Sequence, residues 1–148
     1  MIYANNSPTV SVFFISPDNQ KVLLANRVIE PHKGMLTVPG GFLDAGESFE
    51  EGAMRELNEE LDLKDDDYGP LTYLTSTHDA YPYQNEIIPI VNVLFWSRLK
   101  SSKTLHPSDD ITNANWHRLA DIDFSALHAD DIRTGIHALQ KMFNKEKN

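Results

Sequence analysis

Three carboxylates and an arginine stand close together near the middle of the chain, in the run R-E-L-N-E-E that starts at Arg55. Glu56, Glu59 and Glu60 are spaced by three and four residues, so a helix through this run places them on one face. Like charges at this spacing repel one another, which indicates that something positive lies among them. Magnesium is held in proteins by a few carboxylates together with substrate phosphates. We therefore interpret the run as a candidate metal site.

A helix start and a glycine turn precede these carboxylates. Ser48 and Glu51 have the spacing of a capping box, which predicts a helix with one apolar stripe at Phe49, Ala53, Leu57 and Leu61. Arg55 is then within reach of Glu51 and Glu59, each four residues away. A solvated acidic helix face is the ordinary alternative for a Glu-rich helix. The turn Pro39-Gly40-Gly41 argues against that alternative, because it leaves the backbone bare where a ligand could approach closely.

The segment from Gly41 to Leu63 closely resembles the signature of the Nudix hydrolases, G-x5-E-x7-R-E-U-x-E-E-x-G-U, in which U is apolar. The positions in register are Gly41, Glu47, Arg55, Glu56, Leu57, Glu59, Glu60 and Leu63. Asp62 departs from the signature, which has glycine at that position. This residue closes the helix, and we expect Asp62 to adopt the left-handed conformation that Asp tolerates at modest cost.

The resemblance implies an enzyme that hydrolyses the pyrophosphate linkage of a nucleoside diphosphate joined to another group, such as ADP-ribose or NADH. It implies Mg²⁺ or Mn²⁺ ions that neutralise the pyrophosphate and help to create the nucleophile. Their ligands would be Glu56, Glu59, Glu60 and a backbone carbonyl of the glycine turn, at Gly40. Arg55 would pair with Glu47 and hold the loop against the helix. Which carboxylate deprotonates the water differs among subfamilies, so the general base stays open.

Many Nudix enzymes supply a further acid from a loop after the sheet. In one branch this acid lies six residues ahead of a tryptophan that starts a strand, and here that register falls on Asp110, ahead of Trp116. Asp109 and Glu86 are rivals for the same catalytic role. The alternative is a plain polar turn at residues 107–110.

Candidate substrate contacts are harder to find in the sequence. Arg27, near the end of a predicted strand, could contact a phosphate, and Gly41 would allow a ligand to approach the backbone. Tyr81 and Tyr83 fall in a Pro-containing loop that we predict after a strand, where they could stack on a base. A solvated surface for Arg27 and ordinary packing for the tyrosines are the alternatives.

Composition is that of a small soluble enzyme with a single domain over residues 1–148. The net charge of −9 argues against a general affinity for nucleic acids. The chain has no cysteine, which excludes disulfides and a thiol nucleophile, and its histidines lack the spacing of a zinc site. No signal peptide precedes the first strand, and no apolar run is long enough to span a membrane. We expect a cytoplasmic protein; a homodimer is left open.

Hydrophobic patterns predict strands at residues 9–15, 21–28, 36–38, 71–77, 87–99 and 115–119, with a hairpin turn at 16–19 and a second amphipathic helix at 129–143. Strands on both sides of one helix, followed by a closing helix, indicate a mixed β-sheet between helices. The resemblance implies the Nudix α/β/α sandwich.

Three functions remain open from the sequence. The first is hydrolysis of a nucleoside diphosphate derivative, and the second is a nucleoside triphosphate pyrophosphohydrolase. The third is a non-catalytic nucleotide-sensing module, which the intact R-E-x-x-E-E set argues against. The products distinguish these functions: AMP with ribose 5-phosphate, pyrophosphate, or none.

Overall fold

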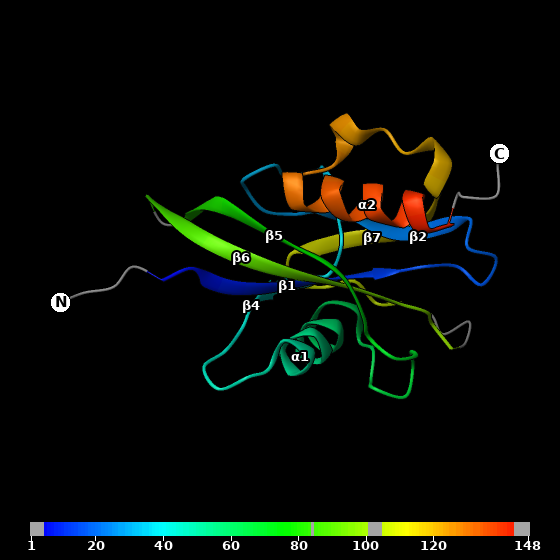
Figure 1. Ribbon diagram of the computed structural model, residues 1–148, viewed down its shortest axis with the longest axis horizontal. Coiled ribbons are helices and arrows are strands. Elements are labelled where there is room, and N and C mark those ends of the chain that lie inside the picture. The colour runs from blue at the N-terminus through cyan, green and yellow to red at the C-terminus, as the bar shows by residue number, and fades with distance from the viewer. Residues whose placement is uncertain (1–4, 84, 101–104, 144–148) are drawn as a thin grey trace.

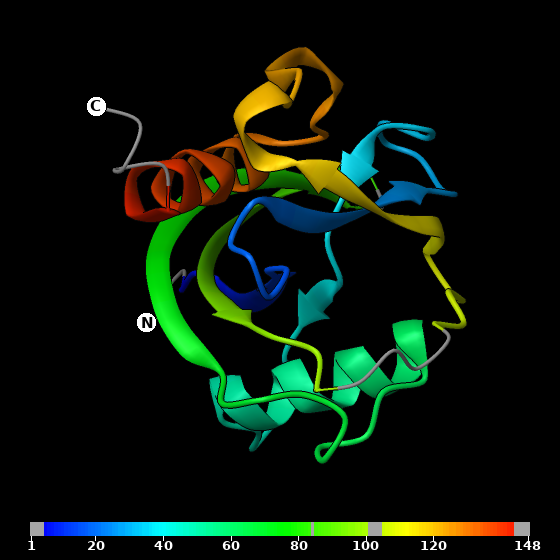
Figure 2. The same ribbon diagram turned by 90° about the vertical axis from the view of Figure 1, so that its right-hand side faces the viewer.

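The computed structural model describes residues 5–83, 85–100 and 105–143. Two β-sheets pack together, and an α-helix covers each outer side (Figures 1 and 2). The elements are β1 (Ser7–Phe14), β2 (Lys21–Arg27), β3 (Leu36–Thr37), β4 (Gly40–Phe42), α1 (Phe49–Leu61), β5 (Thr72–Tyr83), β6 (Glu86–Ser97), β7 (Ile111–Arg118), the 3₁₀ turns Leu119–Asp121 and Phe124–Ala126, and α2 (Asp130–Phe143). This arrangement confirms the predicted sandwich of sheet between helices.

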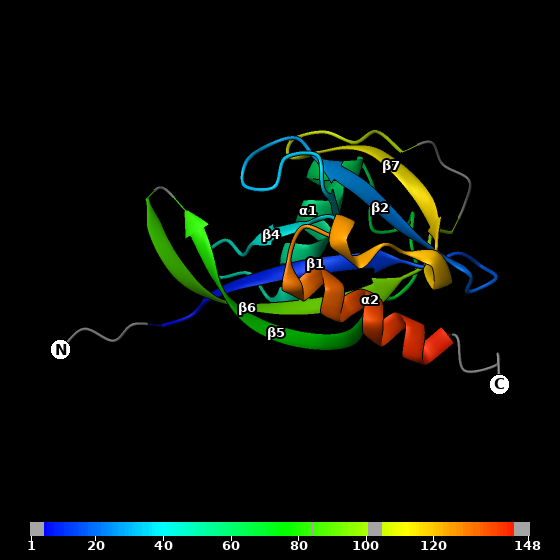
Figure 3. The ribbon, with the colours of Figure 1, turned by 90° about the horizontal axis from the view of Figure 1, so that it is seen from above.

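The larger sheet is mixed, and the smaller sheet is antiparallel. The four-stranded sheet has the order β4-β1-β6-β5, in which β1 and β6 run parallel and the other neighbours run antiparallel. The three-stranded sheet has the order β3-β2-β7. Seen from above, α2 lies over the region where β1, β5 and β6 run side by side (Figure 3).

The predicted hairpin of residues 9–15 and 21–28 is wrong beyond its turn. The turn forms, because the amide of Ser16 donates to the carbonyl of Lys21 at 2.9 Å. After the bridge between Ile15 and Val22, however, the two strands separate into different sheets. Both edges of β1 are already occupied, by β4 and β6, so β2 pairs with β3 and β7 instead.

The prediction of a loop at residues 81–83 is also wrong. β5 continues to Tyr83 and pairs with β6 along its whole length. β5 is the edge strand of its sheet, where a proline such as Pro82 is tolerated because one side of the strand needs no partner. The glycine turn is likewise more ordered than we expected, because Gly40–Phe42 forms the opposite edge strand, β4.

The first strand is buried on both faces and separates two apolar cores. Val10, Val12 and Phe14 pack in the core under α1, whereas Phe13 and Ile15 pack in the core under α2. Burial of both apolar faces provides the main stabilisation of this layered arrangement. Within the residues that the structure describes, no helix is long and apolar enough to cross a lipid bilayer.

Helix α1 starts and ends as its sequence predicts. The Ser48 hydroxyl accepts a hydrogen bond from the amide of Glu51, and the Glu51 carboxylate accepts one from the amide of Ser48, which completes the capping box. Asp62 ends the helix in the left-handed conformation, with φ of 56°. The departure from the family signature is therefore accommodated at the helix end.

Candidate active site

Arg55 holds the loop before α1 against the helix. Its Nε and Nη2 donate to the two carboxylate oxygens of Glu47 at 2.7 and 3.0 Å, and Nη2 also donates to the carbonyl of Phe42 at 3.0 Å. The Arg55 guanidinium, followed by the amide of Asp44, keeps the pKa of Glu47 below its usual range. The pairing of Arg55 with Glu47 is thus present as expected, and it fixes the loop to the helix at two points.

The same guanidinium reaches the carboxylate cluster. Nη1 of Arg55 donates to Glu56 at 3.0 Å and lies 3.3 Å from Glu59. The expected contact with Glu51 is not among the ion pairs of Arg55, because that carboxylate serves the capping box. Arg55 therefore supplies part of the positive charge that the spacing of the carboxylates indicated.

Glu60 and Glu56 form a pair of carboxyl groups, of which Glu60 is buried and Glu56 is partly buried. Glu60 is only 4% exposed and accepts a hydrogen bond from the amide of Gly40 at 2.8 Å. Burial, and next the charge of Glu56, raise the pKa of Glu60 well above its usual range. Burial also raises the pKa of Glu56. Two acidic groups that share a buried site favour a proton or a cation between them.

Glycine is required at both positions of the turn that faces this pair. A Cβ on Gly41 would lie 2.6 Å from Oε1 of Glu56, and a Cβ on Gly40 would lie 2.1 Å from the carbonyl oxygen of Val10. Val12 donates to Pro39 and Leu43 donates to Pro8, so the antiparallel alternation turns the amide and carbonyl of Gly40 away from β1. Because its amide reaches Glu60, the Gly40 carbonyl lies on that same side.

The chemistry of these donor groups fits a hard divalent cation, but the third carboxylate of the run, Glu59, is directed elsewhere. Glu56 and Glu60 offer buried carboxylate oxygens beside a free-edge carbonyl, and Gly41 leaves room that a Cβ would fill. In the described part of the chain, no three acidic or histidine groups converge as a metal site. The reason is Glu59, whose half-exposed side chain is directed to Arg55. Glu59 would join the other two only by turning away from that arginine.

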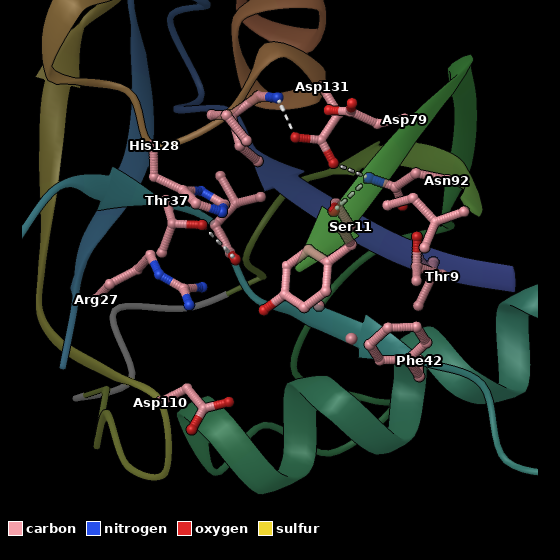
Figure 4. Close-up of a pocket in the computed structure, with 18 of the residues that line it drawn as sticks. Thr9, Ser11, Arg27, Thr37, Phe42, Asp79, Asn92, Asp110, His128 and Asp131 are labelled. Carbon is pink, nitrogen blue, oxygen red and sulfur yellow. Dashed lines mark hydrogen bonds between the residues drawn. The ribbon is translucent and has the colours of Figure 1, made fainter. Parts of the chain in front are cut away.

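A pocket of about 250 Å³ opens beside Glu60 (Figure 4). Six of the residues singled out from the sequence line it, namely Arg27, Gly40, Gly41, Glu60, Tyr81 and Asp110. The other predicted site residues on α1 and its loop do not line it, namely Glu47, Arg55, Glu56 and Glu59. The side chain of Tyr83 falls outside the described residues. Among the rival acids, neither Asp109 nor Glu86 lines the pocket.

Asp110 and Arg27 occupy the part of the wall next to β7 and β2. Asp110 directly precedes β7, its carbonyl accepts from the amide of Val28 at 2.9 Å, and its charge contributes to the raised pKa of Glu60. Nε of Arg27 donates to the carbonyl of Pro31 at 2.8 Å, while its Nη2 is buried without a partner. An unpaired buried N–H of this kind has a donor to offer to a bound anion.

Sequence reasoning missed the polar residues at the other end of the pocket. These are Ser11, Asp79, Asn92 and Asp131, which come from four separate parts of the chain. His128 was also missed; it lines the pocket on the side of Arg27, whose charge contributes to its lowered pKa (Figure 4). One signal was available, because Asn92 interrupts the apolar run of residues 87–96. Asp131 carried no such signal, since an aspartate in the first turn of a helix is explained by the helix dipole alone.

Comparisons with known proteins identify the family of the chain. The chain is 43% identical over 56 residues to ADP-ribose pyrophosphatase of Methanocaldococcus jannaschii, a match that covers 38% of this chain and 33% of that protein. It is 28% identical over 120 residues to the NAD-capped RNA hydrolase NudC of Salmonella typhi, covering 81% of this chain and 42% of that one. The chain thus spans less than half the length of these curated relatives.

Solved structures share the fold. The NUDIX domain of Shewanella oneidensis NrtR, complexed with ADP ribose, superposes with a TM-score of 0.73 at 23% identity, covering 95% of this chain and 90% of that one. An Ap4A hydrolase binary complex from C. elegans gives a TM-score of 0.71 at 17% identity, covering 93% and 98%. The family model described as NUDIX domain matches residues 5–139. The chain belongs to the NUDIX domain family.

Proposed function

We propose that this protein is a metal-dependent hydrolase that cleaves the pyrophosphate linkage of a nucleoside diphosphate derivative of the ADP-ribose or NADH type. The observation that carries the proposal is the Glu56–Glu60 carboxyl pair, in which Glu56 is partly buried and Glu60 is buried and forms part of the pocket wall. Such a pair does not improve packing, because burying two acidic groups together destabilises the fold unless a proton or a cation neutralises them. The same pocket offers Arg27 for a phosphate.

The substrate class rests on the pocket and on the relatives together. The names of the curated relatives concern ADP-ribose and NAD-capped RNA, and the NUDIX domain of NrtR was solved with ADP ribose. ADP-ribose and the NAD cap both contain an adenosine diphosphate unit. The aromatic, cationic and acidic side chains of the pocket wall suit the base and the phosphates of a nucleotide of this kind. The net charge of −9 favours a small nucleotide over an RNA chain.

Glu56, Glu60 and the Gly40 carbonyl would hold the metal, joined by Glu59 when it leaves Arg55. Bound Mg²⁺ or Mn²⁺ supplies charge neutralisation of the pyrophosphate and lowers the pKa of a water molecule. Arg55 and Glu47 keep the glycine turn and the helix in register, so the carboxylates stay aimed at the same point. Arg27 would contact a phosphate oxygen through its unpartnered Nη2.

In the proposed reaction a water oxygen forms a bond to one phosphorus, and the bond from that phosphorus to the bridging oxygen breaks. We assign the proton of the water to Asp110, because this exposed acid lines the pocket close enough to Glu60 to affect its pKa. The second phosphate leaves with the bridging oxygen. For ADP-ribose the products are AMP and ribose 5-phosphate.

A product assay tests the proposal directly. The protein is incubated with ADP-ribose, NADH and a set of nucleoside triphosphates, with Mg²⁺ or with excess EDTA, and the products are separated. AMP with ribose 5-phosphate, formed only when metal is present, is the expected result. Release of pyrophosphate from a triphosphate would instead identify a triphosphate pyrophosphohydrolase. Binding of ADP-ribose without any product would identify a nucleotide-sensing module.

A further inference from the structure

The end of the pocket opposite Arg27 is lined by hydrogen-bond acceptors. Asn92 on β6 and Asp131 at the start of α2 are hydrogen-bonded to each other there, and Asp79 on β5 lies beside Asp131 (Figure 4). The charge of Asp79 acts on Asp131, which confirms that the two carboxyl groups are close. No part of the proposed hydrolysis uses this group, which we call the acceptor cluster (Asp79, Asn92 and Asp131).

The side-chain nitrogen of Asn92 donates two hydrogen bonds, whereas its side-chain oxygen accepts none. Its Nδ2 donates to Oγ of Ser11 at 3.1 Å and to Oδ2 of Asp131. A carboxylate can only accept, so the amide nitrogen must face Asp131 and the amide oxygen must face the other way. Asn92 is 2% exposed, and its Oδ1 is buried without a hydrogen-bond partner. A buried acceptor left unpaired is costly unless a ligand supplies the missing donor.

The strands show that the cluster belongs to a binding site rather than to the core. On the face of β1 that looks toward α2, Phe13 and Ile15 are core residues, but Thr9 and Ser11 on the same face line the pocket. β6 changes in the same way, from Leu94 in the core to Asn92 in the pocket. The change from apolar to polar comes one side-chain step earlier on β1 than on β6, since Ser11 pairs with Leu94 and Thr9 pairs with Asn92, so both strands are polar at the level of Thr9 and Asn92.

An aromatic wall adjoins the acceptor cluster. Phe42 pairs with Thr9 across β4 and β1, and Thr9 pairs with Asn92, so the three residues form one row across the sheet. Phe42 and Tyr81 are in edge-to-face contact, with ring centroids 5.8 Å apart, and both line the pocket. Flat aromatic surface beside hydrogen-bonding groups is suited to a planar heterocycle, which stacks on the ring and presents its edge to the polar groups.

We propose that Asn92 and Asp131, with Asp79, read the amino-bearing edge of a nucleobase and so select adenine-type nucleotides over bases without an exocyclic amino group. The phosphates then extend toward Arg27 and Glu60 at the other end of the pocket. This inference rests on the proposed function for the identity of the ligand as a nucleotide. Burial raises the pKa of Asp131, which agrees with a group that is largely shielded from water.

Calorimetric titration with three diphosphates in Mg²⁺ buffer tests the inference. The probes are ADP, purine riboside 5′-diphosphate, which has hydrogen in place of the amino group, and 2′-deoxy-ADP. We expect purine riboside diphosphate to bind at least about ten-fold more weakly than ADP, the scale on which an unpaired buried polar group reduces affinity. Equal affinity for these two, or no binding of ADP, overturns the inference. A loss confined to 2′-deoxy-ADP also overturns it, because the cluster then reads ribose hydroxyls.

Two variants test whether Asp131 is responsible for the preference for ADP. Asp131→Asn replaces an acceptor by a donor with little change of shape, so it should reduce the preference for ADP by about ten-fold. Asp130→Asn is the matched control, since Asp130 neighbours it on α2 but pairs with Arg133 outside the pocket and should keep the preference. A preference unchanged in folded Asp131→Asn overturns the assignment, and if that variant does not fold, Asp79→Asn replaces it.

The outcome is independent of catalysis. If the wild-type protein prefers ADP but hydrolyses no nucleotide, the base-reading role stands and the proposed hydrolase function fails. If it hydrolyses ADP-ribose but binds the two purine diphosphates equally, the function stands and the base-reading role fails.

Discussion

The two ends of the pocket are built in opposite ways. The carboxylate end, with Glu60 and the glycine turn, comes from one continuous stretch between Gly40 and Glu60, held by a single helix and one arginine. The acceptor cluster is assembled from β5, β6 and α2, whose residues are up to 52 positions apart, from Asp79 to Asp131. The carboxylate end is thus fixed by local geometry, and the acceptor end by strand register and helix docking.

The two ends also differ in how their charge is balanced. Arg55 touches Glu47, Glu56 and Glu59 directly, and Gly40 donates to Glu60. At the acceptor end, the hydrogen bonds that Asp131 receives within the described part of the chain come from neutral groups, the amide of Ile132 and the side chain of Asn92. The carboxylate end is therefore arranged for a cation, whereas the acceptor end is arranged for a neutral donor.

The largest expected effect is at the carboxylate end. Glu60→Gln removes a metal ligand without changing its shape, so kcat for ADP-ribose should fall at least ~100-fold, the scale of lost metal-site interactions. In metal-free buffer the melting temperature should hold or rise, because Gln is neutral and needs no proton to be buried, whereas Glu60 must take up a proton on folding. Kinetics with Mg²⁺ and thermal melts check both statements.

Glu50→Gln is the control for that variant, because Glu50 is exposed on the first turn of the same helix and lines no pocket. It should leave kcat unchanged. Full activity of Glu60→Gln, or full activity of the wild-type protein in excess EDTA, would sink the metal assignment.

Arg55→Lys should have the next largest effect. Lys keeps the charge but lacks the planar fork that binds both oxygens of Glu47 and the carbonyl of Phe42 together. We expect kcat/KM to fall about ten- to hundred-fold, as for lost partners of metal ligands. The melting temperature should fall by a few degrees, about 2–4 °C per kcal/mol lost. Steady-state kinetics and calorimetric melts measure the two effects.

Arg118→Lys is the matched substitution, since Arg118 is exposed and pairs with Asp121 at the surface. It should change neither quantity. If Arg55→Lys also changes neither, Arg55 does not bridge the loop and the helix.

The difference between the two ends explains what the sequence could predict. The capping box, the apolar stripe of α1 and the contacts of Arg55 depend on spacings within one helix and its loop, and these spacings are visible in the sequence. The mixed sheet between helices followed from strand and helix patterns, and the sandwich from the resemblance to the Nudix hydrolases. Asn92 and Asp131 are 39 positions apart and meet only because β6 lies beside β1 and α2 docks on that sheet. No local pattern encodes that meeting.

The errors have the same physical origin. Tyr81 was assigned to a loop because Pro82 normally interrupts a strand, but the edge position of β5 removes the need for that amide. The false hairpin came from a turn that is real but joins strands of different sheets. In both cases the outcome depends on which strand edges are already paired. The sequence of one segment does not show this, because the pairing depends on the rest of the fold.

Asp110→Asn tests the assignment of Asp110 as the general base. If Asp110 accepts the proton of the attacking water, its loss should reduce kcat more than about ten-fold and alter the acidic limb of the pH–rate profile. The melting temperature should barely change, because the side chain is exposed. Asp109→Asn is the control from the same turn, where Asp109 has φ of 57° and does not line the pocket. Normal kinetics for Asp110→Asn together with a crippled Glu86→Gln would move the role to Glu86.

The pH dependence of stability tests whether Glu60 is protonated in the metal-free folded state. Burial raises the pKa of Glu60 to about 9 from 4.5, so between these values the folded state keeps a proton that the unfolded chain has lost. Stability of the metal-free protein therefore falls as pH rises through this window. His128 has a pKa lowered by burial to about 3, so above pH ~7 it is neutral in both states and adds no slope.

Melting curves between pH ~7 and ~9 should therefore show a decline in the metal-free wild-type protein that is weaker in Glu60→Gln. Added Mg²⁺ should restore more stability to the wild-type protein than to the variant, since binding stabilises only the state that holds the ion. A slope that is identical in the two proteins would show that Glu60 is ionised across this range.

The smallest effect concerns the residue at which the chain departs from its family signature. Asp62 ends α1 with φ of 56°, its amide donates to the carbonyls of Asn58 and Leu57, and its carboxylate stands at the negative end of the helix dipole. Glycine adopts this conformation without a Cβ penalty, although its greater freedom in the unfolded chain offsets part of the gain. Asp62→Gly should therefore raise the melting temperature by about 1–3 °C.

Asp62→Ala keeps the Cβ and loses the local polar contacts that let Asp adopt this conformation, so it should melt lower than the wild-type protein. Both variants should keep kcat, because Asp62 does not line the pocket. A loss of kcat in Asp62→Gly would mean that the helix end positions Glu60, and that the carboxylate end depends on more than its local spacing.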